Sequence, residues 1–447
     1  MTAGSFSSRD VGDPGPCDVC VVGAGPAGLL VGLLLARAGV RVTVLEKHGD
    51  FLRDFRGDTV HPSTLDVLDE LGLGDRVDAL PGRPVRALTA TFADGTFRVA
   101  DFSRLRIPHP YVLFLPQWDL LEMLAAAAAE YPTFLLLRNH AASGLLFDTP
   151  GGPARGVVAT VPAAPSGRPE ATRRQAEIRA RLVIGADGRH STVCAALDAA
   201  GRALTRHEFG TPMDVLWFRL PRWPDDPEGV ALHVGAGRML VLIDRGHYWQ
   251  TAYLIPKDGR EETLAAGTGA LRAGVAALAP WLAGRVGAIV DAEDVAFLPV
   301  RLDRLRRWHS PGVLLIGDAA HAMSPVGGVG INLAVQDAVA AARMLAGPLR
   351  SGAGTAEVTR VLRAFQRRRW FPTAGTQLLQ RGLGRGLIGP ALAADAPVRS
   401  PRAVRLLDRQ PALRGLAGRL VGVGLRPEHV DTPAPRQAPA HAPASPS

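Results

Sequence analysis

The sequence predicts an α/β protein: a Rossmann-like parallel-sheet domain, interrupted by an inserted antiparallel β-sheet and followed by helices. Three apolar strand-like runs, ending near Val22, Ile184 and Ile316, each lead into a glycine-containing turn. Between the last two, successive β-type runs follow one another, over 213–220, 230–234, 239–244 and 248–256. Parallel strands need long crossovers, so one domain assembled from distant segments accounts for this order.

A βαβ unit begins the predicted fold. A buried strand over 18–22 is followed by a helix over 29–38, and a second strand covers 40–45. The glycines between the first strand and the helix are Gly23, Gly25 and Gly28. Cys17 and Cys20 fall on the first strand, where positions i and i+3 face opposite sides, so they are predicted to fill the core without bridging.

The rest of the chain divides by its hydrophobic pattern. Helices are predicted over 65–71, 120–130, 263–279 and 355–370, a hairpin over 85–100 turns at Asp94-Gly95, and the remainder to Val430 is mostly helical. The predicted nucleotide-binding domain comprises 17–85, 117–210 and 295–346, with a substrate domain from 86–116 and 211–294 and a helical region over 347–431. Residues 1–16 and the Pro/Ala/Ser-rich 432–447 are expected to be disordered.

Composition narrows the function classes. The net charge is +9, but it comes from scattered arginines, with lysine only at Lys47 and Lys257. This argues against nucleic-acid binding, which needs a gathered basic surface. Three cysteines give no disulfide framework, and neither a leader nor a membrane-spanning run is evident, so a cytoplasmic protein is expected. The histidines show no paired metal-ligand spacing, and no metal is expected.

The loop Gly23-Ala-Gly25-Pro26-Ala27-Gly28 fits a dinucleotide fingerprint. Its glycines permit a tight turn, close approach of a pyrophosphate and close helix–strand packing. Glu46 ends the second strand, where a ribose diol needs a carboxylate, and Lys47 follows it. The alternative is a sterically required turn with Glu46 merely at the surface. The fingerprint suits FAD and NAD equally, and there is no second one, because Gly235-Ala-Gly237 lacks the third glycine and the helix.

Three motifs in order carry a family resemblance. They are Gly23–Gly28, the run Ala186-Asp187-Gly188-Arg-His-Ser191, and Gly317-Asp318-Ala-Ala-His321. Over residues 17–345 the chain resembles the single-component FAD-dependent aromatic hydroxylases of the para-hydroxybenzoate hydroxylase type. The resemblance implies a glutathione-reductase-like FAD domain and use of FAD, NADPH or NADH, and O₂.

The resemblance also assigns roles to residues of this chain. Arg56 and Gln117 would contact the FAD phosphates and ribityl chain, Asp187 and Gly188 belong to the motif associated with both nucleotides, and Asp318, after Gly317, would accept from a ribityl hydroxyl. Pro325 would lie beside the reactive face of the flavin. Gly328, Gly330, Ile331 and Asn332 would face the isoalloxazine. Cys194 stands where the family usually has an arginine, a loss for which Arg189 and His190 could compensate.

The implied activity is a monooxygenase reaction in which a flavin C4a-hydroperoxide delivers one oxygen atom from O₂ to an aromatic or polyketide-like molecule of secondary metabolism. The protein must then position the substrate and exclude water. Asp58 and His61 are candidate catalytic bases because they lie near Arg56 in the sequence, with a structural role as the alternative.

Substrate contacts are expected from the antiparallel strands. Trp249 and Tyr253 share one face of their strand, and Trp217 lies on one face of another. An aromatic-lined pocket and ordinary sheet packing are both open interpretations of these faces.

Several rival functions are considered. A flavin-dependent halogenase would use an active-site lysine, and none occurs between His48 and Pro256. An epoxidase, a Baeyer–Villiger monooxygenase, an isoprenoid-chain reductase and a non-catalytic flavin-binding protein stay open. The chain is expected to act as a monomer or homodimer.

Overall fold

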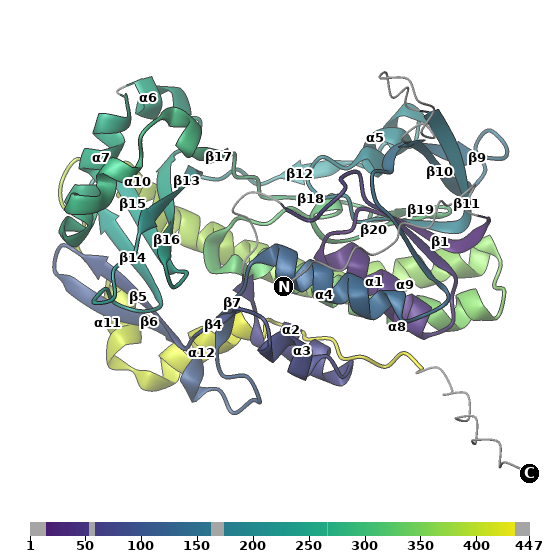
Figure 1. Ribbon diagram of the computed structural model, residues 1–447, viewed down its shortest axis with the longest axis horizontal. Helices are drawn as coiled ribbons and strands as arrows, with labels where there is room; N and C mark the ends of the chain where they lie inside the picture. Colours follow the sequence, from purple (N-terminus) through teal and green to yellow (C-terminus); the bar gives the residue numbers. More distant parts are fainter. Residues whose placement is uncertain (1–14, 53–58, 162–173, 266, 434–447) are drawn as a thin grey trace, which may run out of the picture.

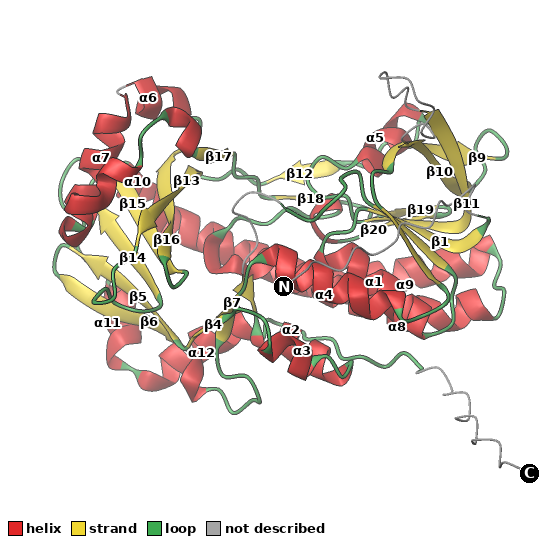
Figure 2. Ribbon diagram, viewed as in Figure 1, coloured by secondary structure: helices red, strands yellow, loops and turns green. Residues whose placement is uncertain are grey.

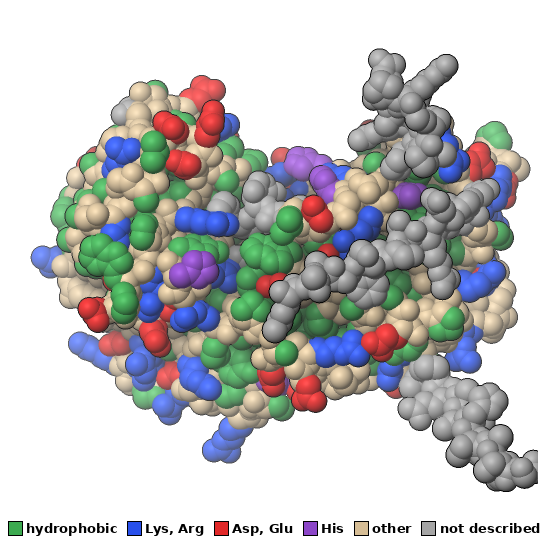
Figure 3. Space-filling model, viewed as in Figure 1, with side chains coloured by type: hydrophobic (Ala, Val, Ile, Leu, Met, Phe, Trp, Pro, Cys, Tyr) green, Lys and Arg blue, Asp and Glu red, His purple; other side chains and the backbone are tan. Residues whose placement is uncertain are grey.

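The computed structural model describes residues 15–52, 59–161, 174–265 and 267–433. They form two lobes joined by two strands that cross between them (Figure 1). One lobe packs long helices against a largely parallel sheet, and the other packs shorter helices on a mostly antiparallel sheet (Figure 2). The fold is therefore of the α/β class. On the face drawn in Figure 3, basic and acidic side chains are interspersed rather than gathered by sign.

The larger lobe contains the predicted βαβ unit. Its sheet has the order β19-β20-β11-β1-β2-β8. These strands are β1 (Cys17–Val22), β2 (Val42–Leu45), β8 (Phe134–Leu137), β11 (Arg174–Gly185), β19 (His309–Ser310) and β20 (Val313–Leu315). β1 pairs in parallel with β2 on one side and β11 on the other, and β11 pairs in parallel with β20. The carboxyl ends of β1, β11 and β20 therefore meet at one edge, although they are far apart in sequence.

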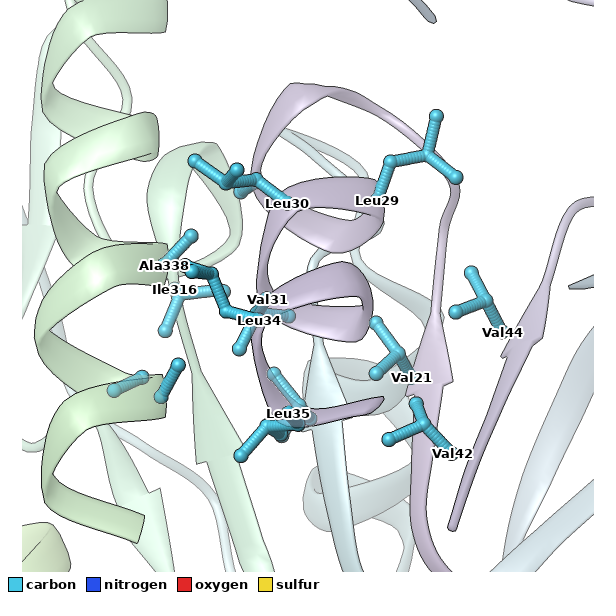
Figure 4. Close-up of a cluster of buried hydrophobic side chains, with 14 of the residues drawn as sticks. Val21, Leu29, Leu30, Val31, Leu34, Leu35, Val42, Val44, Ile316 and Ala338 are labelled. Carbon is cyan, nitrogen blue, oxygen red and sulfur yellow. The ribbon is translucent and has the colours of Figure 1, made fainter. Parts of the chain in front are cut away.

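Helices cover this sheet because its strands are apolar on both faces. They are α1 (Pro26–Arg37), α4 (Gln117–Ala129), α5 (Thr192–Ala199), α8 (Val329–Arg350) and α9 (Thr355–Leu383). Figure 4 shows Leu30 and Leu34 of α1 directed toward Ile316 and Ala338. α8 is the one described helix long and apolar enough to cross a membrane, but 78% of that window is buried, as in the core helix of a globular domain.

The second lobe has a seven-stranded sheet of order β17-β13-β16-β15-β14-β5-β6. The strands are β5 (Ala87–Phe92), β6 (Gly95–Asp101), β13 (Met213–Pro221), β14 (Val230–Gly235), β15 (Arg238–Asp244), β16 (Tyr248–Pro256) and β17 (Ala296–Leu298). The four runs predicted to form an antiparallel sheet, β13 to β16, do so, and β5 joins their sheet by pairing in parallel with β14. Parallel pairing is possible here because the chain passes through the other lobe between these two strands. α6 (Arg260–Ala265), α7 (Gly267–Leu278) and the 3₁₀ segment Pro280–Ala288 lie on one face.

Short strands lie between the lobes. β12 (Arg206–Glu208) pairs with β18 (Asp303–Leu305), and these two segments carry the chain into and out of the second lobe. β3 (Thr59–Val60), β7 (Val112–Phe114) and β4 (Arg83–Val85) form a small sheet near α2 (Pro62–Glu70) and α3 (Gly74–Asp78). β9 (Ala141–Phe147) and β10 (Ala154–Val161) extend β11 as antiparallel strands.

The C-terminal part contributes more than an outer layer of helices. α9 continues through Pro372 to Leu383, beyond the predicted end at Trp370, because buried side chains such as Gln377 and Gln380 bind neighbouring loops. A π-helical turn (Gly384–Ile388), α10 (Gly389–Leu392), α11 (Arg402–Arg409) and α12 (Pro411–Gly422) follow. Thr432, expected to begin a disordered tail, is buried, and its carbonyl oxygen accepts from Arg37 at 2.9 Å. Residues 1–14 and 434–447 lie outside the described part.

Candidate functional site

The glycine loop lies at the carboxyl end of β1 and admits no larger side chain at two positions. Gly23 has φ of +95°, and a Cβ there would lie 2.7 Å from the carbonyl oxygen of Ala186. A Cβ on Gly28 would lie 1.9 Å from the carbonyl oxygen of Gly23. At Gly25, by contrast, a Cβ would meet no described atom within 4 Å, so this side of the backbone is open.

α1 begins at Pro26 and Ala27 without a side-chain cap and without an acidic residue in its first turn. Its first amides therefore remain available to an external acceptor, and the helix dipole favours an anion there. Together with the open backbone at Gly25, this end of the helix is suited to a pyrophosphate.

Glu46 lies where β2 ends and is only 7% exposed. Its Oε2 accepts from the amide of Ala24 at 3.2 Å, and its Oε1 accepts from the amide of His48 at 3.1 Å. The acid is thus fixed beside the glycine loop and is not the surface residue of the alternative interpretation. An ionised carboxylate has further lone pairs, so it can still accept from a ribose. The side chain of Lys47 is exposed.

The second motif adjoins the first because β11 pairs with β1. Asp187 follows β11, and its Oδ2 accepts from the amide of Val193 at the start of α5 at 3.1 Å. Its Oδ1 is buried and has no partner in the described part of the chain. Burial raises the pKa of this carboxyl, with hydrogen bonds from Ser191 and Val193 opposing the effect. Gly188 supplies the positive φ, +79°, that the following turn needs.

A cation near Cys194 comes from outside the second motif. Arg206 of β12 places its guanidinium 3.9 Å from the Cys194 sulfur and donates to the Ala319 carbonyl oxygen at 3.2 Å. Arg189 instead donates to the carbonyl oxygen of Pro299. Arg206 of β12 is thus a further cation at this position, and compensation by Arg189 and His190 stays a prediction.

The third motif forms a turn after β20. Gly317 has φ of +58°, and Asp318 follows it, half-buried and without a hydrogen-bond partner among the described residues. Burial raises the pKa of Asp318, while Arg189 and His321 oppose this rise. A carboxylate in such surroundings without a protein partner calls for an external donor.

Behind this turn lies a buried ionic network that sequence analysis missed. Asp337 of α8 accepts from the Gly317 amide at 3.1 Å and from His321 Nε2 at 2.7 Å. Arg369 of α9 donates to Asp337 at 2.9 Å and to Glu428 at 3.4 Å. Asp337 and Arg369 sit in helical segments without a motif, so only the packing of the helices identifies them.

The loop before α8 combines left-handed glycines with an open helix end. Gly327 and Gly328 have φ of +80° and +64°, and α8 starts without a side-chain cap or an acid in its first turn. Its first turn contains Gly330, Ile331 and Asn332. The Asn332 side chain is occupied internally, because its Oδ1 accepts from Ser63 and Thr64. Pro325 opens the loop.

His61 contacts the backbone of this loop. It is 1% exposed, and its Nε2 lies 3.0 Å from the carbonyl oxygen of Gly328, which also accepts from Thr59 at 2.9 Å. Burial lowers the pKa of His61 to about 4, so the neutral ring donates from Nε2. These contacts favour the structural role that was the alternative to a catalytic base. Asp58 and Arg56 lie outside the described residues.

Acid should reveal the burial of His61. Between pH 6.5 and about 4 the unfolded histidine binds a proton that the folded one does not, so stability falls as pH drops. We expect His61→Gln, which retains an amide donor, to reduce this fall by up to about 1.4 kcal/mol per pH unit. Urea unfolding from pH 7 to pH 4.5 measures it, and parallel pH profiles for the two proteins would contradict the assignment.

The aromatic residues of the second lobe lie on opposite faces of its sheet. Trp249 and Tyr253 pack beneath α7 and the 3₁₀ segment, where the Trp249 indole donates to Asp226 at 2.9 Å. Of the two open interpretations, ordinary sheet packing accounts for the position of both residues. Trp217 lies on the other face, in contact with the cluster to which Val326 belongs, and its indole nitrogen is buried without a partner among the described residues.

These features together form one extended candidate site for a cofactor. They lie at strand ends or helix starts of the larger lobe: the start of α1, Glu46, Asp318 and the start of α8. Gln117, half-buried in the first turn of α4, opens another uncapped helix. The start of α1 suits the pyrophosphate of FAD, the carboxylates of Glu46 and Asp318 suit its hydroxyls, and the free amides at the start of α8 suit the edge of its ring. Within the described part of the chain, no group of three His, Cys, Asp or Glu side chains could hold a metal ion.

Comparisons with known proteins agree with this geometry. The family model described as "FAD binding domain" matches residues 16–377. The 6-methylpretetramide 4-monooxygenase of Streptomyces rimosus is 33% identical over 92% of this chain and 94% of its own length. The chain belongs to the FAD-dependent aromatic monooxygenases.

Other relatives of this monooxygenase bear on how far the likeness extends. The 12-dehydrotetracycline 5-monooxygenase/anhydrotetracycline 6-monooxygenase of Streptomyces rimosus subsp. rimosus is 30% identical over 72% of this chain, which spans 61% of that protein's length. A probable FAD-dependent monooxygenase from Pseudomonas aeruginosa has a similar structure, with a TM-score of 0.69, 22% identity, and coverage of 84% of this chain and 98% of that one. FAD is the cofactor, and NAD(P)H is the reductant typical of the family.

Proposed function

We propose that this monooxygenase hydroxylates a polycyclic aromatic polyketide, consuming NAD(P)H and O₂. The substrate class is supported by the two Streptomyces relatives, whose names specify a pretetramide and tetracycline precursors. Bound FAD would supply the oxygen-activating chemistry, and the protein would position the ring and exclude water. We further propose a cytoplasmic monomer or homodimer, and the cytoplasm is supported by free thiols at all three cysteines.

Trp217 carries this proposal. Its indole N–H is buried without an acceptor in the described part of the chain, on the face of the seven-stranded sheet that packs toward the Pro325 loop. A buried donor without a partner costs free energy, and a phenol or carbonyl oxygen of a substrate would satisfy it. Phe114 and Val421 belong to the apolar cluster on this side, so the surroundings suit an aromatic ring.

The division into an FAD domain (17–85, 117–210, 295–346), a substrate domain (86–116, 211–294) and a C-terminal helical region (347–431) is likewise proposed. It is supported by the pairing of β5 with β14, which puts residues 87–92 into the same sheet as 230–235. The wall provided by Trp217 would then belong to the substrate domain and the cofactor contacts to the FAD domain.

The function is tested with the FAD-loaded protein. NADPH and NADH oxidation is followed with a panel of polycyclic phenols, and products are analysed by mass spectrometry after reaction under isotopically labelled O₂. Incorporation of one labelled oxygen into an aromatic ring supports the proposal. An epoxide or ester product would assign the protein to the epoxidising or Baeyer–Villiger type, and no reduction of FAD by either nucleotide would contradict catalysis.

Substitution of Trp217 separates substrate binding from folding. We expect Trp217→Phe to raise KM for the aromatic substrate about 2- to 10-fold, the factor that a neutral hydrogen bond supplies, without loss of stability. Trp249→Phe is the matched control, because its indole already donates to Asp226. It should lower the free energy of unfolding and leave KM unchanged. Equal KM effects from both variants would remove Trp217 from the substrate site.

A further inference from the structure

A cleft of about 330 Å³ lies where α9 passes into the π-helical turn Gly384–Ile388. Its walls come from four parts of the chain: the end of α9 with the π-helical turn and Gly389, residues 209–213 entering the second lobe, Leu302, and the loop around Ser324 and Val326. Figure 1 shows α10, which follows the π-helical turn, beside the strands of the second lobe. The cleft therefore sits at the junction of the two lobes.

The charge of this cleft is unbalanced. Arg381 and Arg385 line it, and no acidic residue among those that the structure describes does. The guanidinium of Arg381 lies 4.9 Å from the centre of the Phe209 ring, and that of Arg304 lies 5.3 Å from the same centre. Burial and the neighbouring Arg381 lower the pKa of Arg304.

No described carboxylate neutralises these arginines. Asp303, which precedes Arg304, already pairs with Arg206 and Arg301. The Nε of Arg381 is buried and lacks a hydrogen-bond acceptor in the described part of the chain. Arg304 and Arg381 thus lie beside the same Phe209 ring, and the buried Nε of Arg381 lacks a described acceptor. An anionic ligand would supply both the missing negative charge and the missing acceptor.

The cleft is tied directly to the flavin-facing loop. Gln380, next to Arg381, donates to the carbonyl oxygens of Ser324 at 2.8 Å and Val326 at 2.9 Å and accepts from the Ser324 amide at 3.2 Å. Ser324 and Val326 flank Pro325. A ligand held by Arg381 would therefore lie beside the segment on which the flavin ring is expected.

A second nucleotide needs its own anion site. The chain has one dinucleotide fingerprint, Gly23–Gly28, and FAD occupies it in this family. Guanidinium groups present paired N–H donors that match phosphate oxygens. Phe209, Met213 and Ile388 give the same cleft an apolar wall that suits a ring. We propose that Arg381 and Arg385 bind the phosphate groups of the nicotinamide dinucleotide that reduces the enzyme, an assignment that rests on the proposed function.

The test uses FAD-loaded protein and measures binding separately from turnover. Titration calorimetry with NADP⁺ should show Kd raised at least tenfold in Arg381→Ala, and further in the double variant with Arg385→Ala, with partial recovery in Arg381→Lys. Arg367→Ala, an exposed arginine of the same helix, is the control and should match the wild type. In rapid-mixing experiments the NADPH concentration for half-maximal FAD reduction should rise, with the limiting rate and FAD content unchanged.

The outcomes distinguish this proposal from the proposed function. Unchanged NADP⁺ affinity in the double variant, or absence of NADP⁺ binding to the wild type, overturns the assignment even if hydroxylation is observed. If the double variant binds NADP⁺ normally but loses affinity for the aromatic substrate, the assignment is also overturned. The two arginines would then be substrate-binding residues. A third outcome is weakened NADP⁺ binding in the arginine variants of an enzyme whose FAD is reduced but which oxygenates no substrate. This result supports the dinucleotide site in the cleft and contradicts the proposed hydroxylase function.

Discussion

Replacing Arg369 by alanine will lower the free energy of unfolding by about 3–5 kcal/mol, the cost of leaving buried charges without their partner. Arg369 has no exposed surface, and it lies between two buried carboxylates, Asp337 and Glu428. Burial alone would raise the pKa of Asp337, but His321 and Arg369 hold this pKa below its ordinary value. Without Arg369, Asp337 loses its arginine partner while still accepting from the Gly317 amide and from His321.

Urea unfolding at pH 7 measures this loss, and flavin fluorescence reports FAD release in the same titration. Arg367→Ala, two positions away on the exposed side of α9, should change the unfolding free energy by less than about 0.5 kcal/mol. A loss below about 1 kcal/mol in Arg369→Ala would show that the network is not a major source of stability. Arg369→Lys should fall between the two, because an ammonium retains the charge but not the paired donors.

Asp318→Ala will weaken FAD binding by about 10- to 100-fold, the factor corresponding to a hydrogen bond to a charged group. The apoprotein should be at least as stable as the wild type, since Asp318 makes no described hydrogen bond and burial raises its pKa. This opposite pair of effects is characteristic of a residue retained for a ligand. FAD affinity is measured by titrating apoprotein and following quenching of flavin fluorescence.

The control for Asp318 is Asp337→Asn, a carboxylate of the same region that is fully engaged with protein groups. It should destabilise the apoprotein, whereas Asp318→Ala should not. Unchanged FAD affinity in Asp318→Ala, or a loss of apoprotein stability equal to that of Asp337→Asn, would contradict the ribityl assignment. The Asp318→Asn variant should recover part of the affinity, because its amide oxygen still accepts.

Local sequence predicted the cofactor-binding elements because each depends on short-range geometry. Gly23 and Gly28 are required by contacts within a few residues of β1 and by the neighbouring turn at Ala186. Asp318 was recognisable as a carboxylate after a buried strand. The three parallel strands that end in these turns were also predictable, since glycine turns after apolar runs recur along the chain.

Tertiary packing decided the features whose partners are distant in sequence. Strand alternation showed that Trp249 and Tyr253 share a face, but not that α7 covers it, since the register to β13 is set by long-range pairing. His61 had a plausible catalytic chemistry until the approach of Gly328 showed that its ring supports a carbonyl.

The role of the C-terminal segment was also undetermined by sequence. Glu428 lies in a short extended segment without a motif, yet it pairs with Arg343, Arg368 and Arg369 of the two long helices. The helical repeat predicts which charged side chains share a face of one helix. The ion pair between Arg368 of α9 and Glu428, 60 positions later, forms only because the C-terminal segment folds back against that helix. The sequence by itself thus determined the cofactor and its turns, and the tertiary structure determined which buried charges hold those turns in place.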